Sequence, residues 1–241
     1  MSAAVMSAPF VQPSPLFNAR MSGFFWLMTV LTGSFAMFTY QKVVVPGDAA
    51  ATAANILANE PLFRLGVISD IAASACYLAA SLFIYAVLKP VNPTVALLGT
   101  FFSVAGCAIS ALSFAFRLAP LTVLAVSGFT TEQLRGLSHA LIGLNVQAVN
   151  IGFVFFGLHC VLVGSLILES SFIPKGVGAL MVFGGLGWLT FAITSLLSPA
   201  LVLLMIPYIL APGAIGELTL TLWLLVKGVD VRRWNEQAGL A

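Results

Sequence analysis

Charged side chains are scarce in this sequence, because Asp, Glu, Lys and Arg together make up only 7% of its 241 residues. Soluble domains carry about a quarter charged residues, so this chain is not expected to fold in water. The formal net charge of +2 and the lack of any basic run argue against a nucleic-acid partner.

Cysteine and histidine are also rare, with three and two residues respectively. Cys76, Cys107 and Cys160 are far apart in the sequence, which gives neither the close ligand spacing of a zinc site nor a disulfide framework. The sequence contains no HExxH motif, no GxSxG motif and no phosphate-binding glycine loop. We therefore expect no metal and no cofactor, and no familiar catalytic class is indicated.

Long apolar runs dominate the sequence instead. Hydrophobic residues make up 60% of it, and its mean hydropathy is +1.07. A helix that crosses a bilayer needs about 20 apolar residues, and six segments meet this requirement. We therefore predict an all-α fold, an integral membrane bundle of six transmembrane helices. The predicted spans are residues 21–40, 62–89, 95–118, 149–169, 176–197 and 201–227.

Two connections predict short amphipathic helices on the outer side of the membrane. In the first, Asp48 is a good N-cap for the alanine-rich segment that follows, and Pro61 is expected to stop that helix. In the second, Thr130 with Gln133, or the adjacent Thr131-Glu132, can cap a helix that continues into the fourth span. This helix would then project beyond the bilayer.

Lys and Arg in the connections predict the orientation, because they are enriched on the cytoplasmic side of a membrane. One side collects Arg20, Lys89, Lys175, Lys227, Arg232 and Arg233. We therefore predict that both termini are cytoplasmic. The domain organisation is then a flexible N-terminal tail (1–19), a six-span membrane domain (20–228) and a polar cytoplasmic tail (229–241).

The second predicted span contains an acidic residue, Asp70, within its apolar sequence. An ionised carboxylate is costly in hydrocarbon, so Asp70 must face protein. Four further side chains repeat at intervals of three and four and therefore share its face of the helix. They are Ser74, Tyr77, Ser81 and Tyr85.

The third span offers a cation for Asp70. Small residues repeat along it at the same intervals, and this row ends at Arg117. The small residues are Gly99, Ser103, Gly106, Ser110 and Ser113. We predict that this row faces the row of Asp70, and that Asp70 and Arg117 pair in the outer half of the membrane. The pair is either a structural ion pair that fixes helix register or part of a ligand or proton site.

Glu217 is the second acid within a span, and it lies near the middle of the membrane. Pro207 and Pro212 precede it in the same span. Because proline frees backbone carbonyls, they predict a broken helix that lines a cavity. The alternative is a structural glutamate, hydrogen-bonded to hydroxyl groups of the first or fifth span.

Three features of the remaining spans bear on a site. His159 lies among aromatic residues of the fourth span, either as a neutral packing residue or in a proton relay with Glu217. Asn150 begins that span and is a candidate for an outer vestibule. Trp26 and Trp188 are interpreted as packing or interface residues.

Three blocks of sequence carry a family resemblance. They are VPGDAAATAANI at 45–56 continuing to FRLG at 63–66, GFVFFGLHC at 152–160, and GELTLTLWLLVKG at 216–228. The chain resembles a bacterial family of polytopic membrane proteins described as domain of unknown function 4386. The resemblance implies a multi-pass protein of the bacterial cytoplasmic membrane and supplies no activity.

The leading functional hypothesis is a protein that binds a lipophilic or amphipathic small molecule in a pocket of the bundle, surrounded by membrane lipids. The predicted ligand-binding residues are Asp70, Tyr77, Arg117, Asn150, His159 and Glu217. One alternative is an acid–base isomerase with Glu217 or Asp70 as its catalytic acid, a layout similar to that of small transmembrane terpene cyclases. The other alternative is a proton-coupled transporter. A closed cavity at Glu217 would favour the enzyme, and a lateral opening would favour lipid handling.

Overall fold

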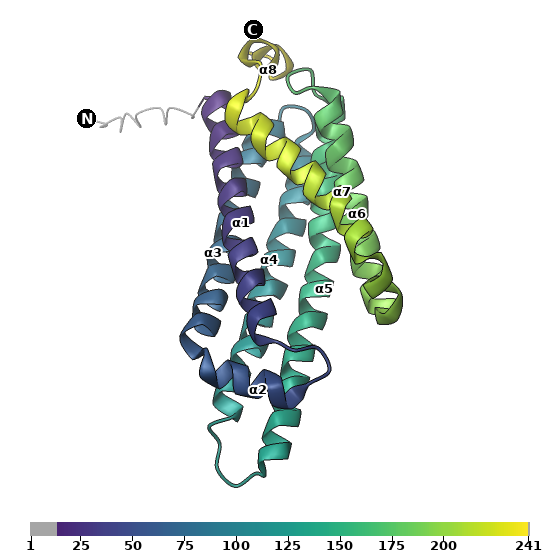
Figure 1. Cartoon of the computed structure of the whole chain (residues 1–241). Coiled ribbons are helices and arrows are strands. Elements are labelled where there is room, and N and C mark those ends of the chain that lie inside the picture. The colour runs from purple at the N-terminus through teal and green to yellow at the C-terminus, as the bar shows by residue number, and fades with distance from the viewer. Residues whose placement is uncertain (1–13, 241) are drawn as a thin grey trace, which may run out of the picture.

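The computed structural model describes residues 14–240, apart from the side chains of residues 203 and 207. Most of the predicted flexible tail, residues 1–13, lies outside the described part of the chain. The described residues form α-helices without strands (Figure 1). The helices are α1 (Pro15–Val43), α2 (Ala49–Ala58), α3 (Glu60–Leu88), α4 (Pro93–Val123), α5 (Thr131–Glu169), α6 (Lys175–Leu197), α7 (Pro199–Val226) and α8 (Val231–Gln237).

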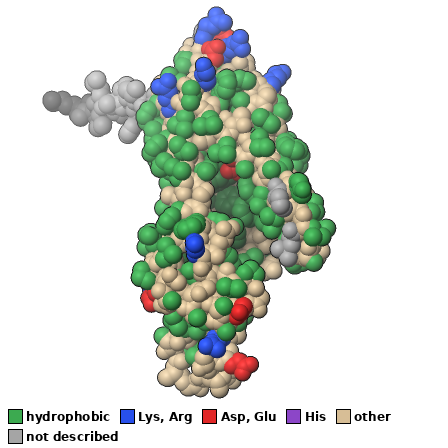
Figure 2. Space-filling model, viewed as in Figure 1, with side chains coloured by type: hydrophobic (Ala, Val, Ile, Leu, Met, Phe, Trp, Pro, Cys, Tyr) green, Lys and Arg blue, Asp and Glu red, His purple; other side chains and the backbone are tan. Residues whose placement is uncertain are grey.

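Six of these helices, α1 and α3 to α7, are long and apolar enough to cross a membrane. The prediction of an all-α, six-span bundle is therefore confirmed. The start of α1 lies at the end of the bundle that carries α8, and α2 lies at the opposite end (Figure 1). Lys and Arg side chains gather at the α8 end (Figure 2). This is the end that the charge pattern predicts to be cytoplasmic.

The helix ends follow local capping chemistry. The side chain of Ser14 accepts a hydrogen bond from the amide of Phe17 at 3.1 Å, so α1 begins six residues before the predicted span. Asp48 caps α2 through the amide of Ala51, as predicted. Pro61 has a different role from the predicted one, because it lies in the first turn of α3, where its missing N–H is not needed.

The capping box of Thr130 and Gln133 is confirmed and begins α5. With 39 residues, α5 is about 58 Å long, which is roughly twice the thickness of the hydrocarbon core. Together with the end of α4 it extends past α2 (Figure 1). This length supports the prediction that the helix projects beyond the bilayer, which stays a prediction.

Glycines allow α5, α6 and α7 to pack closely. Between α5 and α6, a Cβ at Gly157 would lie 3.0 Å from the Gly185 carbonyl oxygen, and one at Gly164 would lie 2.8 Å from that of Gly178. Between α6 and α7, a Cβ at Gly184 would lie 2.9 Å from the Pro212 carbonyl oxygen. These approaches leave no room for larger residues and hold α7 against α6.

The opposite side of α7 meets α1 over only part of its length. Near the α8 end, a Cβ at Gly23 of α1 would lie 2.9 Å from the Leu225 amide nitrogen of α7. Toward its other end α7 diverges from α1 and follows α6 (Figure 1). Figure 2 shows a hollow in the resulting space, with hydrophobic side chains on its visible walls and an acidic side chain at its edge.

Two predictions about helix contacts and shape are wrong. The small residues of α4 pack mainly on α5 and not on α3: a Cβ at Gly99 would lie 3.8 Å from His159 Nδ1, and one at Gly106 would lie 2.7 Å from Phe156. The helix α7 is also not broken at its prolines, because Pro207 and Pro212 both lie within one continuous helix.

Candidate functional site

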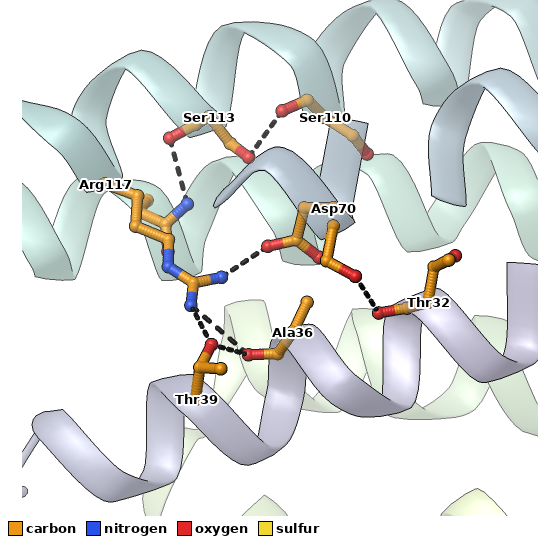
Figure 3. A network of polar contacts seen from close by, with 9 residues as sticks. Thr32, Ala36, Thr39, Asp70, Ser110, Ser113 and Arg117 are labelled. Atoms are coloured by element: carbon orange, nitrogen blue, oxygen red, sulfur yellow. Dashed lines mark hydrogen bonds and ion pairs between the residues drawn. The ribbon is translucent and has the colours of Figure 1, made fainter. Parts of the chain in front are cut away.

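Asp70 and Arg117 form an ion pair between α3 and α4, as predicted. Figure 3 shows the guanidinium group of Arg117 between α4, α3 and α1. Its Nη2 atom also donates hydrogen bonds to the Ala36 carbonyl oxygen and to Thr39 Oγ1, each at 3.2 Å. We call these four residues, Asp70, Arg117, Ala36 and Thr39, the arginine cluster.

The arginine cluster is closed by the protein itself. The side chain of Arg117 is only 4% exposed, and that of Asp70 is 24% exposed. The rings of Tyr40 and Phe63 lie 5.2 and 5.7 Å from the guanidinium carbon, close enough for cation–π attraction. Each charge therefore has a protein partner, and the cluster ties α1, α3 and α4 together.

Gly66 makes room for this arrangement. A Cβ at this position would overlap the hydroxyl of Thr39 and lie 3.0 Å from Arg117 Nη2. The guanidinium group can reach the Ala36 carbonyl only because α3 carries no side chain here. Gly66 is required here because neighbouring side chains approach closely and not because of its backbone conformation, since it lies in an ordinary helix.

Glu217 lies in a second polar cluster. Its carboxyl group accepts hydrogen bonds from the indole N–H groups of Trp26, at 3.2 Å, and Trp188, at 2.6 Å. The thiol of Cys160 lies 3.7 Å from the same oxygen as Trp188, and the hydroxyl of Tyr77 lies 3.9 Å from that thiol. We call these five residues, Glu217, Trp26, Trp188, Cys160 and Tyr77, the glutamate cluster.

Three helices, α1, α5 and α6, supply donors to Glu217 on α7, and Tyr77 of α3 joins the cluster through the thiol of Cys160. In the part of the chain that the structure describes, no Lys or Arg lies within ion-pair distance of Glu217. The glutamate cluster therefore differs from the arginine cluster in having only neutral donors. Glu217 is also only half-buried, on the helix that borders the hollow of Figure 2.

Aromatic rings surround the glutamate cluster. Phe153 stacks on Trp188 with ring centroids 4.9 Å apart, and Phe156 meets Tyr77 edge to face at 4.8 Å. Such ring pairs add about 0.5–1.5 kcal/mol each beyond the burial of their area. They fix the orientations of Trp188 and Tyr77, so the hydrogen-bond donors are held in place around Glu217.

His159 belongs to the wall of this cluster but is not bonded to Glu217 in the described part of the chain. Its Nδ1 atom lies 2.8 Å from the Gly99 carbonyl oxygen, and its Nε2 atom is buried without a partner among the described residues. Its ring centroid lies 6.0 Å from that of Trp26. The predicted relay between His159 and Glu217 therefore has no direct link, and His159 mainly joins α5 to α4.

The six predicted ligand-binding residues do not share one pocket. Tyr77, His159 and Glu217 lie together, whereas Asp70 is seven residues before Tyr77, about 10 Å along the axis of α3. Asn150 is buried on α5, about 13 Å along that helix from His159. The structure thus places Tyr77, His159 and Glu217 at the glutamate cluster, Asp70 and Arg117 in the arginine cluster, and Asn150 farther along α5.

Trp26, Trp188 and Cys160 were not identified from the sequence as partners of Glu217. Their sequence context predicts packing or interface roles for Trp26 and Trp188, although a buried indole N–H needs an acceptor. Trp26 lies 11 residues into α1, and Glu217 lies nine residues before the end of α7. Counting residues from the helix ends on the α8 side indicates that the indoles and the carboxyl group lie at a similar depth in the bundle.

No group of three or more His, Cys, Asp or Glu residues within residues 14–240 is arranged to hold a metal ion. The glutamate cluster itself presents a carboxyl group, a thiol and a phenol. A carboxyl group can accept hydrogen bonds or exchange a proton. It can also attract a cationic group.

Comparison with known proteins adds a family but no activity. The family described as Domain of unknown function (DUF4386) matches residues 21–228, a range that includes all three resembling sequence blocks. An uncharacterized protein of Archaeoglobus fulgidus is 29% identical over 80 residues. The aligned part covers 33% of this chain and 46% of that protein, so the chain spans less than half the length of this relative. No solved structure matches the chain.

Proposed function

This chain belongs to the DUF4386 family, and we propose that, as a multi-pass membrane protein, it binds an amphipathic small molecule whose polar end meets Glu217. The apolar part of the molecule would lie in the hollow between α1 and α7. The description of the family assigns no function, so the proposal depends on the geometry of the glutamate cluster.

One observation carries the proposal: Glu217, a half-buried residue whose carboxyl group has only neutral donors among the described residues, lies on the helix that borders a lateral hollow. A carboxylate offers about four lone-pair positions, and Trp26, Trp188 and Cys160 occupy three of them. The remaining position can accept a hydrogen bond from a ligand. The favoured polar end is therefore a hydrogen-bond donor, and an amine fits best because it would also neutralise the charge.

The lateral position of the hollow favours binding over the enzyme alternative. An acid–base isomerase needs a closed apolar cavity that excludes water from a reactive carbocation or enolate. The divergence of α1 and α7 leaves a hollow on this side of the bundle (Figures 1 and 2), which in a six-span protein would face the bilayer. A lipophilic molecule can enter the hollow sideways from the bilayer without crossing a polar face.

The indoles at Glu217 provide a direct test, because a ligand in contact with Trp26 and Trp188 changes their fluorescence. Dodecylamine, dodecanol and dodecanoate are titrated into the purified protein in detergent. We expect dodecylamine to bind at least tenfold more tightly than dodecanoate, whose carboxylate would be repelled. In Glu217→Gln this preference should disappear.

Glu132→Gln is the matched control, because it is the same substitution at an exposed position of α5. It should bind all three probes as the wild type does. Equal binding of dodecylamine and dodecanoate to the wild type, or an unchanged preference in Glu217→Gln, would contradict the proposal.

A further inference from the structure

An open groove lies at the α8 end of the molecule, apart from both polar clusters. Its volume is about 710 Å³, and it lies between the connection of α5 to α6 and the connection of α7 to α8. The amide of Asp230 donates a hydrogen bond to the Phe172 carbonyl oxygen at 3.2 Å, which joins the two connections. The shape of the groove is therefore fixed by contacts between segments far apart in the sequence.

Three cationic side chains line this groove, Lys175, Lys227 and Arg233, against one acidic side chain, Asp230. Arg233 lies 3.6 Å from Asp230 through its Nε atom. Neither lysine forms an ion pair with an acidic residue in the part of the chain that the structure describes. The groove therefore holds two positive charges without an acidic partner among residues 14–240.

The short helix α8 holds Arg233 beside the groove. Trp234 is buried, and its indole N–H donates to the Val87 carbonyl oxygen at 2.8 Å. Arg233 itself donates from Nη1 to the Ser171 carbonyl oxygen at 3.3 Å. These contacts dock the predicted polar tail against the bundle, so its charge belongs to a defined surface.

Apart from Ser170 and Ser171, the rest of the groove lining is mainly apolar. Phe172, Ile173 and Val229 line it and are buried, and Trp223 lines it with its indole N–H bonded to the Gly228 carbonyl oxygen at 3.1 Å. Tryptophan and lysine are typical of the level where a span meets the head groups of the bilayer. Lys227 directly follows the last residue of α7, so the groove lies at this level.

We propose that this groove binds the phosphodiester head group of an anionic phospholipid. Lys175, Lys227 and Arg233 would attract the phosphate, and the apolar lining would contact the glycerol and the first carbons of the acyl chains. Basic pockets at the ends of transmembrane helices commonly bind such head groups. A free phosphate ion would use the cations but would gain nothing from the apolar lining.

The test is native mass spectrometry of the full chain in detergent, titrated with dioleoyl phosphatidylglycerol or dioleoyl phosphatidylcholine. Each lysine contributes about a fivefold gain in affinity for an anionic lipid. We therefore expect Lys175→Gln with Lys227→Gln to lower phosphatidylglycerol affinity about thirtyfold and to leave phosphatidylcholine binding unchanged. The double variant should keep its fold, measured by circular dichroism, because both lysines are exposed.

Arg20→Gln with Lys89→Gln is the matched control, since it removes two positive charges from the same end but outside the groove. It should bind phosphatidylglycerol as the wild type does. An equal loss of affinity in the control and in the groove variant would overturn the proposal, because general surface charge would then explain binding. Displacement of the lipid by an equimolar amount of inorganic phosphate would overturn it too.

Discussion

The two polar clusters of this bundle each contain one carboxyl group, but they satisfy it in different ways. In the arginine cluster, Asp70 meets the cation of Arg117, and both are held among helices α1, α3 and α4. In the glutamate cluster, Glu217 meets two indoles and a thiol and keeps partial exposure beside a hollow.

The difference separates a structural role from a ligand-binding one. A buried charge that has its own counter-ion fixes the register of its helices, and removal of one partner is costly. A carboxyl group held by neutral donors has its position fixed but retains capacity for a further partner. The presence of a carboxyl group within a span is therefore less informative than the charge of the groups around it.

Arg117→Met is expected to have the largest effect on stability, because it leaves the carboxylate of Asp70 without its cation. Breaking a buried ion pair from one side typically costs about 3–5 kcal/mol. We expect a loss of this size in the unfolding free energy, measured by denaturant titration in detergent. Glu217→Gln should lose much less, because every partner of Glu217 is neutral.

Asp70→Asn combined with Arg117→Met removes both charges and tests whether the pair acts as a unit. It should recover most of the stability that Arg117→Met loses, since no unpaired charge remains. If the double variant were as unstable as the single one, the arginine cluster would not be the structural ion pair described here.

Gly66→Ala should give the next largest loss, because the added methyl group overlaps the Thr39 hydroxyl. Overpacking of this kind costs about 1–3 kcal/mol, which should appear as a lowered melting temperature in detergent. Gly143→Ala is the control, since a Cβ there meets nothing within 4 Å. It should be neutral or stabilise the helix by up to about 1 kcal/mol. Equal losses in both variants would show that the arginine cluster does not depend on the open space at Gly66.

Trp188→Phe should have the smallest effect on stability and a specific effect on binding. The phenyl ring of the variant can still stack on Phe153, but Glu217 loses its hydrogen-bond donor at 2.6 Å. We expect this loss to lower the unfolding free energy by about 1–2 kcal/mol. The preference for dodecylamine should weaken. Trp223→Phe, which also removes an indole N–H, should lose similar stability and keep the preference. If both variants kept the preference, the indole at Glu217 would have no part in binding.

Much of the fold could be predicted from the sequence. The six spans follow from apolar length, and the pairing of Asp70 with Arg117 follows from helical periodicity and the cost of a charge in hydrocarbon. Periodicity gives the direction of a row of residues on its own helix, but not which neighbouring helix it meets. For this reason the small residues of α4 were assigned to α3, whereas Gly99 and Gly106 pack on α5.

The partners of Glu217 show a second limit of sequence reasoning. The first and fifth spans were correctly named as sources of hydrogen bonds, but the expected hydroxyl groups are indoles. Tryptophan serves both packing and hydrogen bonding, so its residue type does not reveal which role applies. The continuity of α7 could not be predicted either, because its prolines indicate a break. In the structure α7 is one continuous helix that packs closely on glycines of α6.

The length of α5 has a practical consequence for observing this protein. Its first turns and the end of α4 extend past α2 (Figure 1), and the residues of the connection at 125–130 are all exposed. An epitope tag inserted at Gly128, where the backbone has a φ of 94° and no helix is interrupted, would stand well clear of the lipid surface. Antibody access to that tag in intact cells would report which way the whole bundle is inserted.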